Sequence, residues 1–364
     1  MKKINSIQVL RGLAAIAVVL YHMGIIEKKY SEGNTLLPAF FKIGQSGVDL
    51  FFVISGFIMV TITKTIERHK IKIKKFLLHR FARIYPNYWF YFSLTFLVFL
   101  IQPQFVNSSQ GNHFDFITSF FLLPSNNLPL VLVGWSLIYE IYFYLIFSGI
   151  MQLKKKLVIL LLSTWLIFLI LTNLFLVPPA SAVLKLLMNP YSIEFIFGAF
   201  CAFIANDKKI LRLPLAFFLF LITAVILSLP FLFLRFYSIN ISGLFIQSLV
   251  FGILFSVFVL ACVAVEKKTN IRFPNLFIKI GDASYTIYLS HVLILGFWGR
   301  LWASYLQRPA AVWDNIFILT AMLTSILIYS IIAYRLIERP SYNFFINILS
   351  FSKEKGSITL QKKL

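Results

Sequence analysis

The chain has 364 residues, of which 59% are hydrophobic and 41 are phenylalanine, and its formal net charge is +21. Globular proteins are usually about 45–50% apolar, so this composition excludes a soluble globular domain and indicates a polytopic membrane protein. The basic residues lie in short stretches between apolar runs, which excludes a basic domain that binds a nucleic-acid duplex. Cys201 and Cys262 lie in apolar runs without metal-ligand spacing, so we expect neither a disulfide nor a metal site.

Ten apolar segments are long enough to cross about 30 Å of hydrocarbon. Only helices satisfy their own backbone groups in lipid without closing into a barrel, so we predict an all-α membrane helix bundle of about ten transmembrane helices. The segments are 7–26, 44–64, 84–103, 129–150, 157–177, 190–206, 213–234, 243–265, 281–299 and 314–337. The longest outer connection is 104–128, and its "FITSFFLL" could lie flat on the membrane surface.

The basic residues predict the orientation of the bundle. If the N-terminus is cytoplasmic, most of the 34 Lys and Arg residues fall in cytoplasmic loops, above all in the 64–83 loop. This distribution predicts that both termini are cytoplasmic. We expect one transmembrane domain over 1–340 and a basic, disordered cytoplasmic tail over 341–364.

The first segment contains "RGLAAIAVVLYH", in which Arg11 and His22 are the ionisable residues. Ionisable groups cost roughly 2.5 kcal/mol or more each in a membrane helix. Arg11 and His22 are eleven positions apart, about three turns, so they share one helix face and are separated by about 16 Å along the axis. Taken singly, they could be a snorkelling arginine and an interfacial histidine.

The second segment reads "GVDLFFVISGFIM". Asp49 lies near its outer end, at about the depth of His22, where it could orient the histidine ring or cap the helix. Phe51, Phe52, Ser55 and Gly56 follow. Gly56 would let another chain approach closely, and ligand binding and plain helix packing are equally good readings of that glycine.

Before the third segment, "HRFARIYP" places Arg80 and Arg83 three positions apart. The two arginines face the same way on a helix, which suits a phosphate or pyrophosphate. The alternative is a basic loop that binds anionic lipid. We expect no special role for His79, and we interpret Glu338 in the later "ERP" as structural.

Two later segments carry further polar residues. In "GWSLIYEIYFY", Trp135 and Glu140 lie mid-segment, and a carboxylate there needs a partner or a water-filled cavity. In "GDASYTIYLSH", Ser284 and His291 are seven positions apart, two turns, on a common face.

In their order along the chain, these motifs resemble those of the acyltransferase-3 family of bacterial membrane O-acyltransferases. The likeness covers roughly residues 5–340 and includes Arg-x10-His, "FFVISG", the paired arginines, "WSLIYE" and "SYTIYLSH". The resemblance implies a multi-pass protein of the bacterial cytoplasmic membrane. It also implies transfer of an acetyl or other small acyl group from acyl-CoA to O-antigen, capsule or exopolysaccharide. We do not expect the esterase-like domain of the family's larger members.

The resemblance also suggests roles for the residues. His22 and Asp49 are the expected catalytic pair. The donor acetyl-CoA is expected to contact Arg11, Phe51, Phe52, Ser55, Gly56, Arg80 and Arg83. Supporting or acceptor-binding roles are expected for Trp135, Glu140, Ser284 and His291. A sugar hydroxyl is a poor nucleophile, and a positioned base contributes about 10²–10⁴-fold. His22 could supply that base or first accept the acyl group itself.

The competing interpretation is a membrane transporter or a lipid or glycan flippase, which would also line a path with buried charged residues. The cytoplasmic arginine pair and the lack of a visible internal repeat favour the enzyme. A structural scaffold would leave the buried charges without a purpose.

Overall fold

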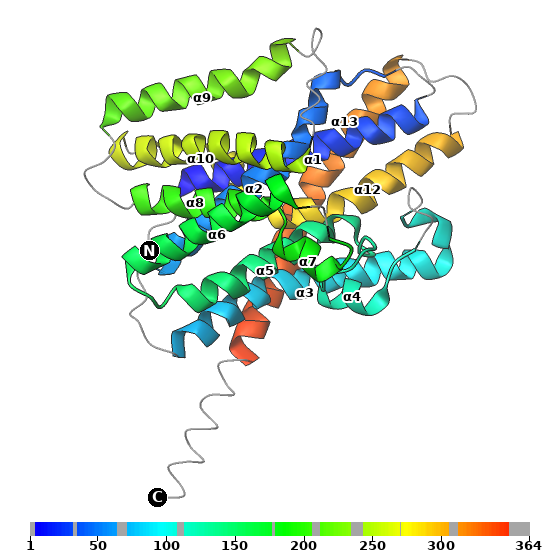
Figure 1. Ribbon diagram of the computed structural model, residues 1–364. Helices are drawn as coiled ribbons and strands as arrows, with labels where there is room; N and C mark the ends of the chain where they lie inside the picture. The colour runs from blue at the N-terminus through cyan, green and yellow to red at the C-terminus, as the bar shows by residue number, and fades with distance from the viewer. Residues whose placement is uncertain are drawn as a thin grey trace, which may run out of the picture.

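The computed structural model describes residues 4–31, 35–63, 71–107, 113–176, 179–205, 212–233, 243–269, 271–305 and 312–348. Every regular element in these ranges is a helix, which confirms the all-α prediction (Figure 1). The long helices are α1 (Asn5–Tyr30), α2 (Gly47–Thr63), α3 (Ile71–Ile101), α5 (Trp135–Ile150), α6 (Lys155–Phe175), α8 (Tyr191–Ala205), α9 (Leu213–Phe233), α10 (Leu244–Thr269), α12 (Ser284–Tyr305) and α13 (Val312–Ala333). The short ones are η1 (Ala39–Ser46), η2 (Pro103–Phe105), α4 (Phe116–Phe121), η4 (Leu132–Gly134), α7 (Ala182–Leu187), α11 (Asn275–Asp282) and the π-helical turn η5 (Tyr334–Glu338).

Eight helices within these described ranges are long and apolar enough to cross a membrane, so the chain is a multi-pass membrane protein. The other two predicted segments correspond to α9 and α12. The apolar part of α9 is a shorter helix over Leu213–Ser228, and α12 carries Thr286, His291 and Arg300 among its apolar residues. A total of ten spans and the cytoplasmic position of both termini stay predictions.

Two helices extend beyond the predicted membrane segments. The basic stretch before the third span is helical from Ile71 onward rather than a loop, because Phe76, Ile84 and Tyr88 recur at helical spacing and are buried in the core. At the other end, the helix that begins with α13 continues through η5 to residue 348. The predicted domain boundary at 340 therefore falls inside a helix, and residues 349–364 of the predicted tail lie outside the described residues.

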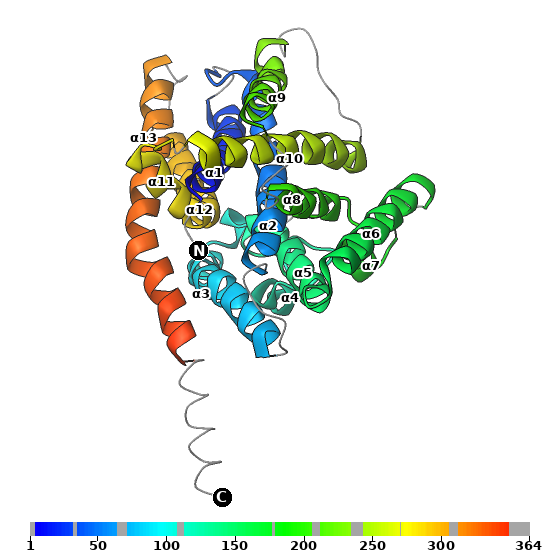
Figure 2. The same ribbon diagram turned by 90° about the vertical axis from the view of Figure 1, so that its left-hand side faces the viewer.

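The segment "FITSFFLL" does not lie flat but packs along α3 as α4 (Figures 1 and 2). The last carbonyls of α4 accept hydrogen bonds from α3: Tyr85 Oη and Tyr88 Oη donate to Phe121 and Ser119, at 2.9 and 2.6 Å, and Trp89 Nε1 donates to Phe120 at 3.0 Å. These donors lie in the middle of α3. They satisfy backbone groups that would otherwise be costly at membrane depth.

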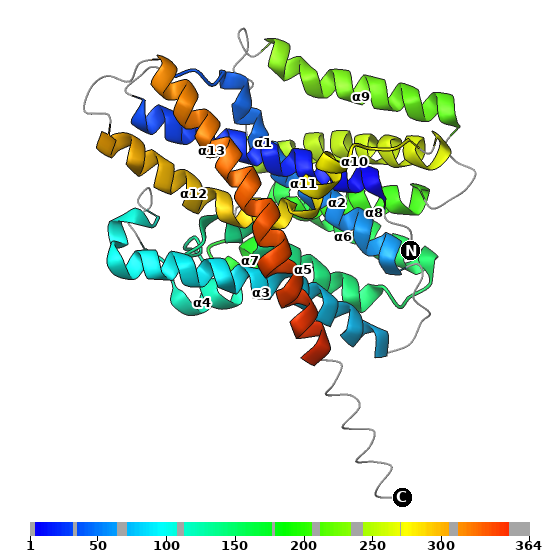
Figure 3. The same ribbon diagram turned by 180° about the vertical axis from the view of Figure 1, so that it is seen from behind.

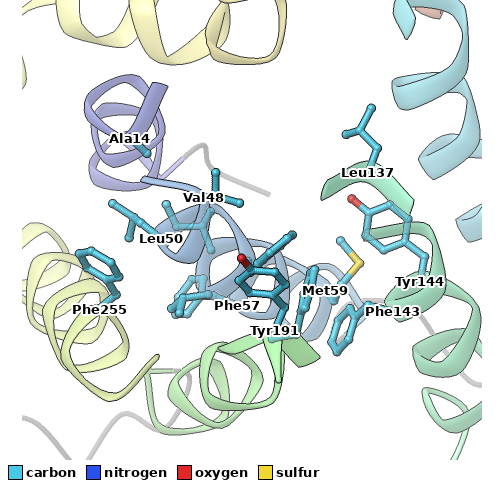
Figure 4. Packing of buried hydrophobic residues seen from close by; sticks show 14 of the residues in the cluster. Ala14, Val48, Leu50, Phe57, Met59, Leu137, Phe143, Tyr144, Tyr191 and Phe255 are labelled. Atoms are coloured by element: carbon cyan, nitrogen blue, oxygen red, sulfur yellow. The ribbon is translucent and has the colours of Figure 1, made fainter. Parts of the chain in front are cut away.

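Helix α2 forms the centre of the main core and contacts α1, α5, α8 and α10. Figure 4 shows side chains of α2 between those of the surrounding helices. The labelled residues are Val48, Leu50, Phe57 and Met59 of α2, Ala14 of α1, Leu137, Phe143 and Tyr144 of α5, Tyr191 of α8 and Phe255 of α10.

A very close helix contact joins α2 and α8 through two glycines. A Cβ atom at Gly56 would lie 1.9 Å from the carbonyl oxygen of Phe195, and one at Gly198 would lie 1.9 Å from that of Val53. Glycine at both positions lets the two backbones touch, as small residues do between membrane helices. This contact answers the question left open for Gly56 in favour of packing.

On its other side, helix α1 contacts α11, α12 and α13, and α13 crosses α1 obliquely (Figure 3). Glu266, near the end of α10, accepts hydrogen bonds from the backbone of Asn5 and Ser6 at 2.8 and 2.9 Å. A carboxylate at a helix N-terminus is stabilising by about 0.3–1 kcal/mol. The bond also fixes the start of α1 against the core.

We predict that Gly198→Ala destabilises the folded protein by about 1–3 kcal/mol, because the added methyl group meets backbone that cannot rotate away. The measurement is thermal unfolding of the purified protein in detergent. Gly149→Ala is the matched control, since a Cβ at Gly149 meets no atom within 4 Å. Equal melting temperatures for the two variants would contradict the tight α2–α8 contact.

Candidate functional site

Two cavities meet in the middle of the bundle. The larger has a volume of about 620 Å³ and lies between α1, α3 and the helical segment that follows α13, with Ile62 of α2 and Asp282 of α11 also on its wall. The inner one is narrow, about 60 Å³, and lies between α1, α2, α3, α5 and α12. Arg11 and Arg83 line both cavities, so the two spaces adjoin at these side chains.

The larger cavity is strongly basic. One face of α3 contributes Lys75, His79, Arg80 and Arg83, and Arg11 of α1 faces them. Arg11 and Arg80 are only 8% exposed. An arginine this deeply buried needs a polar cavity or a partner, because transfer of its charge into an apolar interior is costly.

The charge of these arginines is available for a ligand. Arg11 Nη1 donates to Gln8 Oε1 at 3.4 Å. The Arg80 guanidinium lies 5.6 Å from the ring of Phe76 and 5.7 Å from that of Tyr144, and its buried Nε has no hydrogen-bond partner in the described part of the chain. Glu338 and Glu140 interact electrostatically with Arg11 and Arg83. The wall of the larger cavity nevertheless carries more basic side chains than carboxylates. The cavity therefore suits an anion with several oxygens.

Sequence reasoning missed part of this cavity. His79 lines it, and its Nδ1 lies 2.8 Å from the Tyr342 hydroxyl. Glu338 also lines it and accepts a hydrogen bond from Thr286 Oγ1. The signal for His79 was present in the sequence: Lys75, His79 and Arg83 recur every four residues, which places them on one helix face once the stretch is known to be helical.

The inner cavity holds the mid-membrane carboxylate. Glu140 accepts hydrogen bonds from Ser55 Oγ at 3.1 Å and from the Tyr144 hydroxyl, so it has both partners and a cavity. On the same lining, Ser136 Oγ and Tyr288 Oη lie 2.7 Å apart. Phe51 and Phe52 supply the apolar part of the wall.

Six of the predicted site residues line neither cavity, and three of them are Trp135, Gly56 and Ser284. The ring of Trp135 packs against Tyr191 and Phe52, with centroids 5.3 and 6.5 Å apart. Gly56 serves the contact with α8. Ser284 is fully buried, and its hydroxyl has no hydrogen-bond partner in the described ranges. None of the three lines either cavity.

The two histidines of the predicted motifs come together. His291 Nε2 lies 3.3 Å from His22 Nδ1, although α1 and α12 are far apart in the sequence. His22 Nδ1 is also 2.9 Å from the carbonyl oxygen of Val18, and His291 Nδ1 is 3.1 Å from that of Ile287. His291 is fully buried, whereas His22 is partly exposed.

The histidine pair lies beyond the inner cavity rather than in it. Tyr288 stands between: its ring centroid is 5.9 Å from that of Phe51 on the cavity wall and 5.9 Å from that of His291. Neither histidine lines either cavity.

Contrary to the prediction, Asp49 does not contact His22. Its two carboxylate oxygens each lie 3.4 Å from Gln247 Nε2 of α10, and it also interacts with Glu194 of α8. Asp49 and His22 lie at similar depth on neighbouring helices, but depth does not determine the direction in which a side chain faces. Asp49 lies on the face of α2 that is turned toward α8 and α10. Its place beside His22 is taken by His291.

Within the described residues, no group of three or more His, Cys, Asp or Glu side chains could hold a metal ion.

Comparison with known proteins gives one consistent answer. A family model described as an acyltransferase domain matches residues 4–335. The chain is 27% identical to the exopolysaccharide production protein ExoZ of Rhizobium meliloti over 309 residues, which cover 82% of this chain and 90% of that protein. It is 29% identical to the peptidoglycan O-acetyltransferase OatA of Listeria monocytogenes over 172 residues, 43% of this chain and 25% of that protein. No solved structure gives a significant match.

We predict that Arg80→Gln and Arg83→Gln each weaken binding of ADP, a probe that carries a pyrophosphate, by about 10-fold or more. One hydrogen bond to a charged group is worth about 1.5–3 kcal/mol. Equilibrium binding to the detergent-solubilised protein gives the measurement. Lys268→Gln, an exposed lysine at the end of α10 outside the cavity, is the control. Unchanged ADP affinity in both arginine variants would favour the lipid-binding alternative.

Proposed function

Because the chain belongs to the acyltransferase-3 family, we propose that it transfers an acetyl or other small acyl group from cytoplasmic acyl-CoA to a hydroxyl of a surface glycan. The coarse activity, that of a membrane acyltransferase, follows from the family. One observation supports the proposed donor and acceptor. Along α1, a basic cavity at Arg11, a narrow inner cavity and the histidine pair at His22 follow one another.

The larger cavity fits the anionic head of CoA. That head carries phosphate and pyrophosphate groups, which guanidinium groups bind through paired, charge-assisted hydrogen bonds. Arg80 and Arg83 would hold these phosphates, with Arg11 at the junction of the two cavities. The pantetheine arm of the donor would then enter between Phe51, Phe52 and Ser55 of α2.

His22 is the group that would activate the acceptor. In direct transfer, the hydroxyl of the acceptor gives its proton to the imidazole, and its oxygen bonds to the acyl carbon. The carbon–sulfur bond then breaks, and the CoA sulfur takes up the proton. In the alternative route, the imidazole first accepts the acyl group and then passes it to the hydroxyl. Both routes need the thioester beside His22, so the side chains of Phe51 and Tyr288 must make room at the end of the inner cavity.

A glycan is the acceptor class that the relatives favour. The relative matched over 90% of its length is an exopolysaccharide production protein, and the other is a peptidoglycan O-acetyltransferase. Neither name refers to lipopolysaccharide, so exopolysaccharide is the first acceptor to test and O-antigen is not carried forward. A bacterial cytoplasmic membrane is the expected location.

The acceptor would reach His22 from the outer side. His22 lies about 16 Å along α1 from Arg11, and the distribution of basic residues predicts that Arg11 is near the cytoplasmic face. His22 is partly exposed yet lines neither cavity. Its exposed edge is therefore separate from the proposed donor path, which leaves the acceptor a route of its own.

We predict that His22→Ala lowers the rate of acyl transfer by two orders of magnitude or more, on the scale of a lost general base. Purified protein with labelled acetyl-CoA and an exopolysaccharide acceptor provides the assay. His113→Ala, in an exposed outer loop, is the control. Near-normal turnover by His22→Ala would remove the assignment, and no acyl transfer by the wild-type protein would favour the transporter or flippase.

We predict that the donor and the acceptor act from opposite faces of the membrane. Right-side-out and inside-out vesicles are supplied with labelled acetyl-CoA on one face and an impermeant acceptor on the other. Label should appear when acetyl-CoA is on the cytoplasmic face and the acceptor on the outer face. Labelling only with both on the cytoplasmic face would instead mean a transferase that works wholly inside the cell.

A further inference from the structure

We infer that His291 is a positioning residue: it helps hold His22 in the tautomer that leaves Nε2 as the free base. This inference rests on the proposed function, in which His22 takes the proton of the acceptor. It follows from three short contacts and from which atoms in them are able to donate.

The carbonyl oxygens decide where the hydrogens lie. A carbonyl oxygen only accepts hydrogen bonds. His291 Nδ1, 3.1 Å from the Ile287 oxygen, must therefore carry the hydrogen, which leaves Nε2 of neutral His291 as an acceptor. His22 Nδ1 faces two acceptors, the Val18 oxygen at 2.9 Å and His291 Nε2 at 3.3 Å, so it must carry its hydrogen too. Neutral His22 then has its lone pair on Nε2.

The opposite assignment is unfavourable. If His291 Nε2 donated to a bare His22 Nδ1, the Val18 oxygen would face a lone pair at 2.9 Å. In neutral His291, the Ile287 oxygen would face a second lone pair at 3.1 Å. A doubly protonated His291 would instead place a full charge on a fully buried ring, which is costly without a counter-charge.

The same contacts suit the proton-transfer step. When the acceptor O–H bond breaks, the proton goes to His22 Nε2, while the acceptor oxygen bonds to the acyl carbon and the carbon–sulfur bond breaks. The sulfur leaves with the electron pair and takes up from Nε2 the proton that came from the acceptor. Throughout the step, the Nδ1 hydrogen stays with Val18 and His291. His291 cannot pass a proton onward, since its other partner is the carbonyl oxygen of Ile287, so it orients the base and does not relay protons.

The position of His291 predicts which kinetic constant it affects. It lines neither cavity, so the binding of the donor head should not depend on it. Its loss leaves the Val18 carbonyl as the only acceptor for His22 Nδ1 and frees the ring to turn. We therefore expect kcat to fall while KM for acetyl-CoA stays within about twofold of the wild-type value.

The kinetic test compares His291→Leu with His291→Gln. Leucine accepts no hydrogen bond, and kcat should fall by about 10- to 100-fold, part of the general-base contribution. Glutamine offers a side-chain oxygen to the same Nδ1 hydrogen, and kcat should stay within about threefold of wild type. Ser290→Ala is the matched control, because Ser290 is buried in the same helix and pairs with Ser330, 3.2 Å away. Equal losses in the Leu and Gln variants, or a loss confined to KM, would overturn the inference.

A spectroscopic test needs no turnover. Nitrogen-15 NMR of ring-labelled histidine, with the His22 signal assigned through His22→Ala, reports which ring nitrogen carries the hydrogen. We expect a protonated Nδ1 and a bare Nε2 in the wild type, and a mixture of tautomers in His291→Leu. A wild-type His22 with its hydrogen on Nε2 would contradict the inference. Failure of acyl transfer altogether, with the expected tautomer still present, would instead overturn the proposed function.

Discussion

The cost of placing charged groups inside an apolar helix bundle decides where this molecule is hollow. Arg11 and Arg80 are almost fully buried. Such side chains remain charged only where water or an anion reaches them, and the cavity of about 620 Å³ lies beside both. The mid-membrane carboxylate of Glu140 follows the same rule, with two hydroxyl donors and its own narrow space.

The same cost applies to backbone groups, and it explains how irregular chain is tolerated beside the site. The carbonyls at the end of α4 receive donors from the middle of α3, and the Val133 carbonyl before α5 receives the hydroxyls of Ser136 and Tyr288, each at 3.1 Å. Because these groups are satisfied, α5 can begin in the interior rather than at the membrane surface. Its first turn then brings Ser136 to the inner cavity, opposite Phe51 and Tyr288.

Helix α1 contributes to two parts of the candidate site, the basic cavity and the histidine pair. Near its start, Arg11 joins the arginines of α3 around the basic cavity. About three turns further along α1, His22 meets His291 of α12. In the proposed reaction, one helix thus connects the place where the donor head binds with the place where the acceptor loses its proton. The side chain of Tyr288 lies between the inner cavity and the histidine pair and separates them.

The sequence alone determined the properties that depend on composition and on the period of a single helix. Its apolar content required a membrane protein, and the spacing of Arg11 and His22, and of Arg80 and Arg83, placed each pair on one face. The ordered motifs also identified the acyltransferase family, which the match over residues 4–335 confirms. Only the tertiary structure decided how each helix is rotated against its neighbours. Because of that rotation, Asp49 faces Gln247 and Gly56 packs against α8. It also places His291 beside His22, although the two are 269 positions apart in the sequence. These outcomes depend on packing between distant segments, and a helical period fixes which residues share a face but not what that face meets.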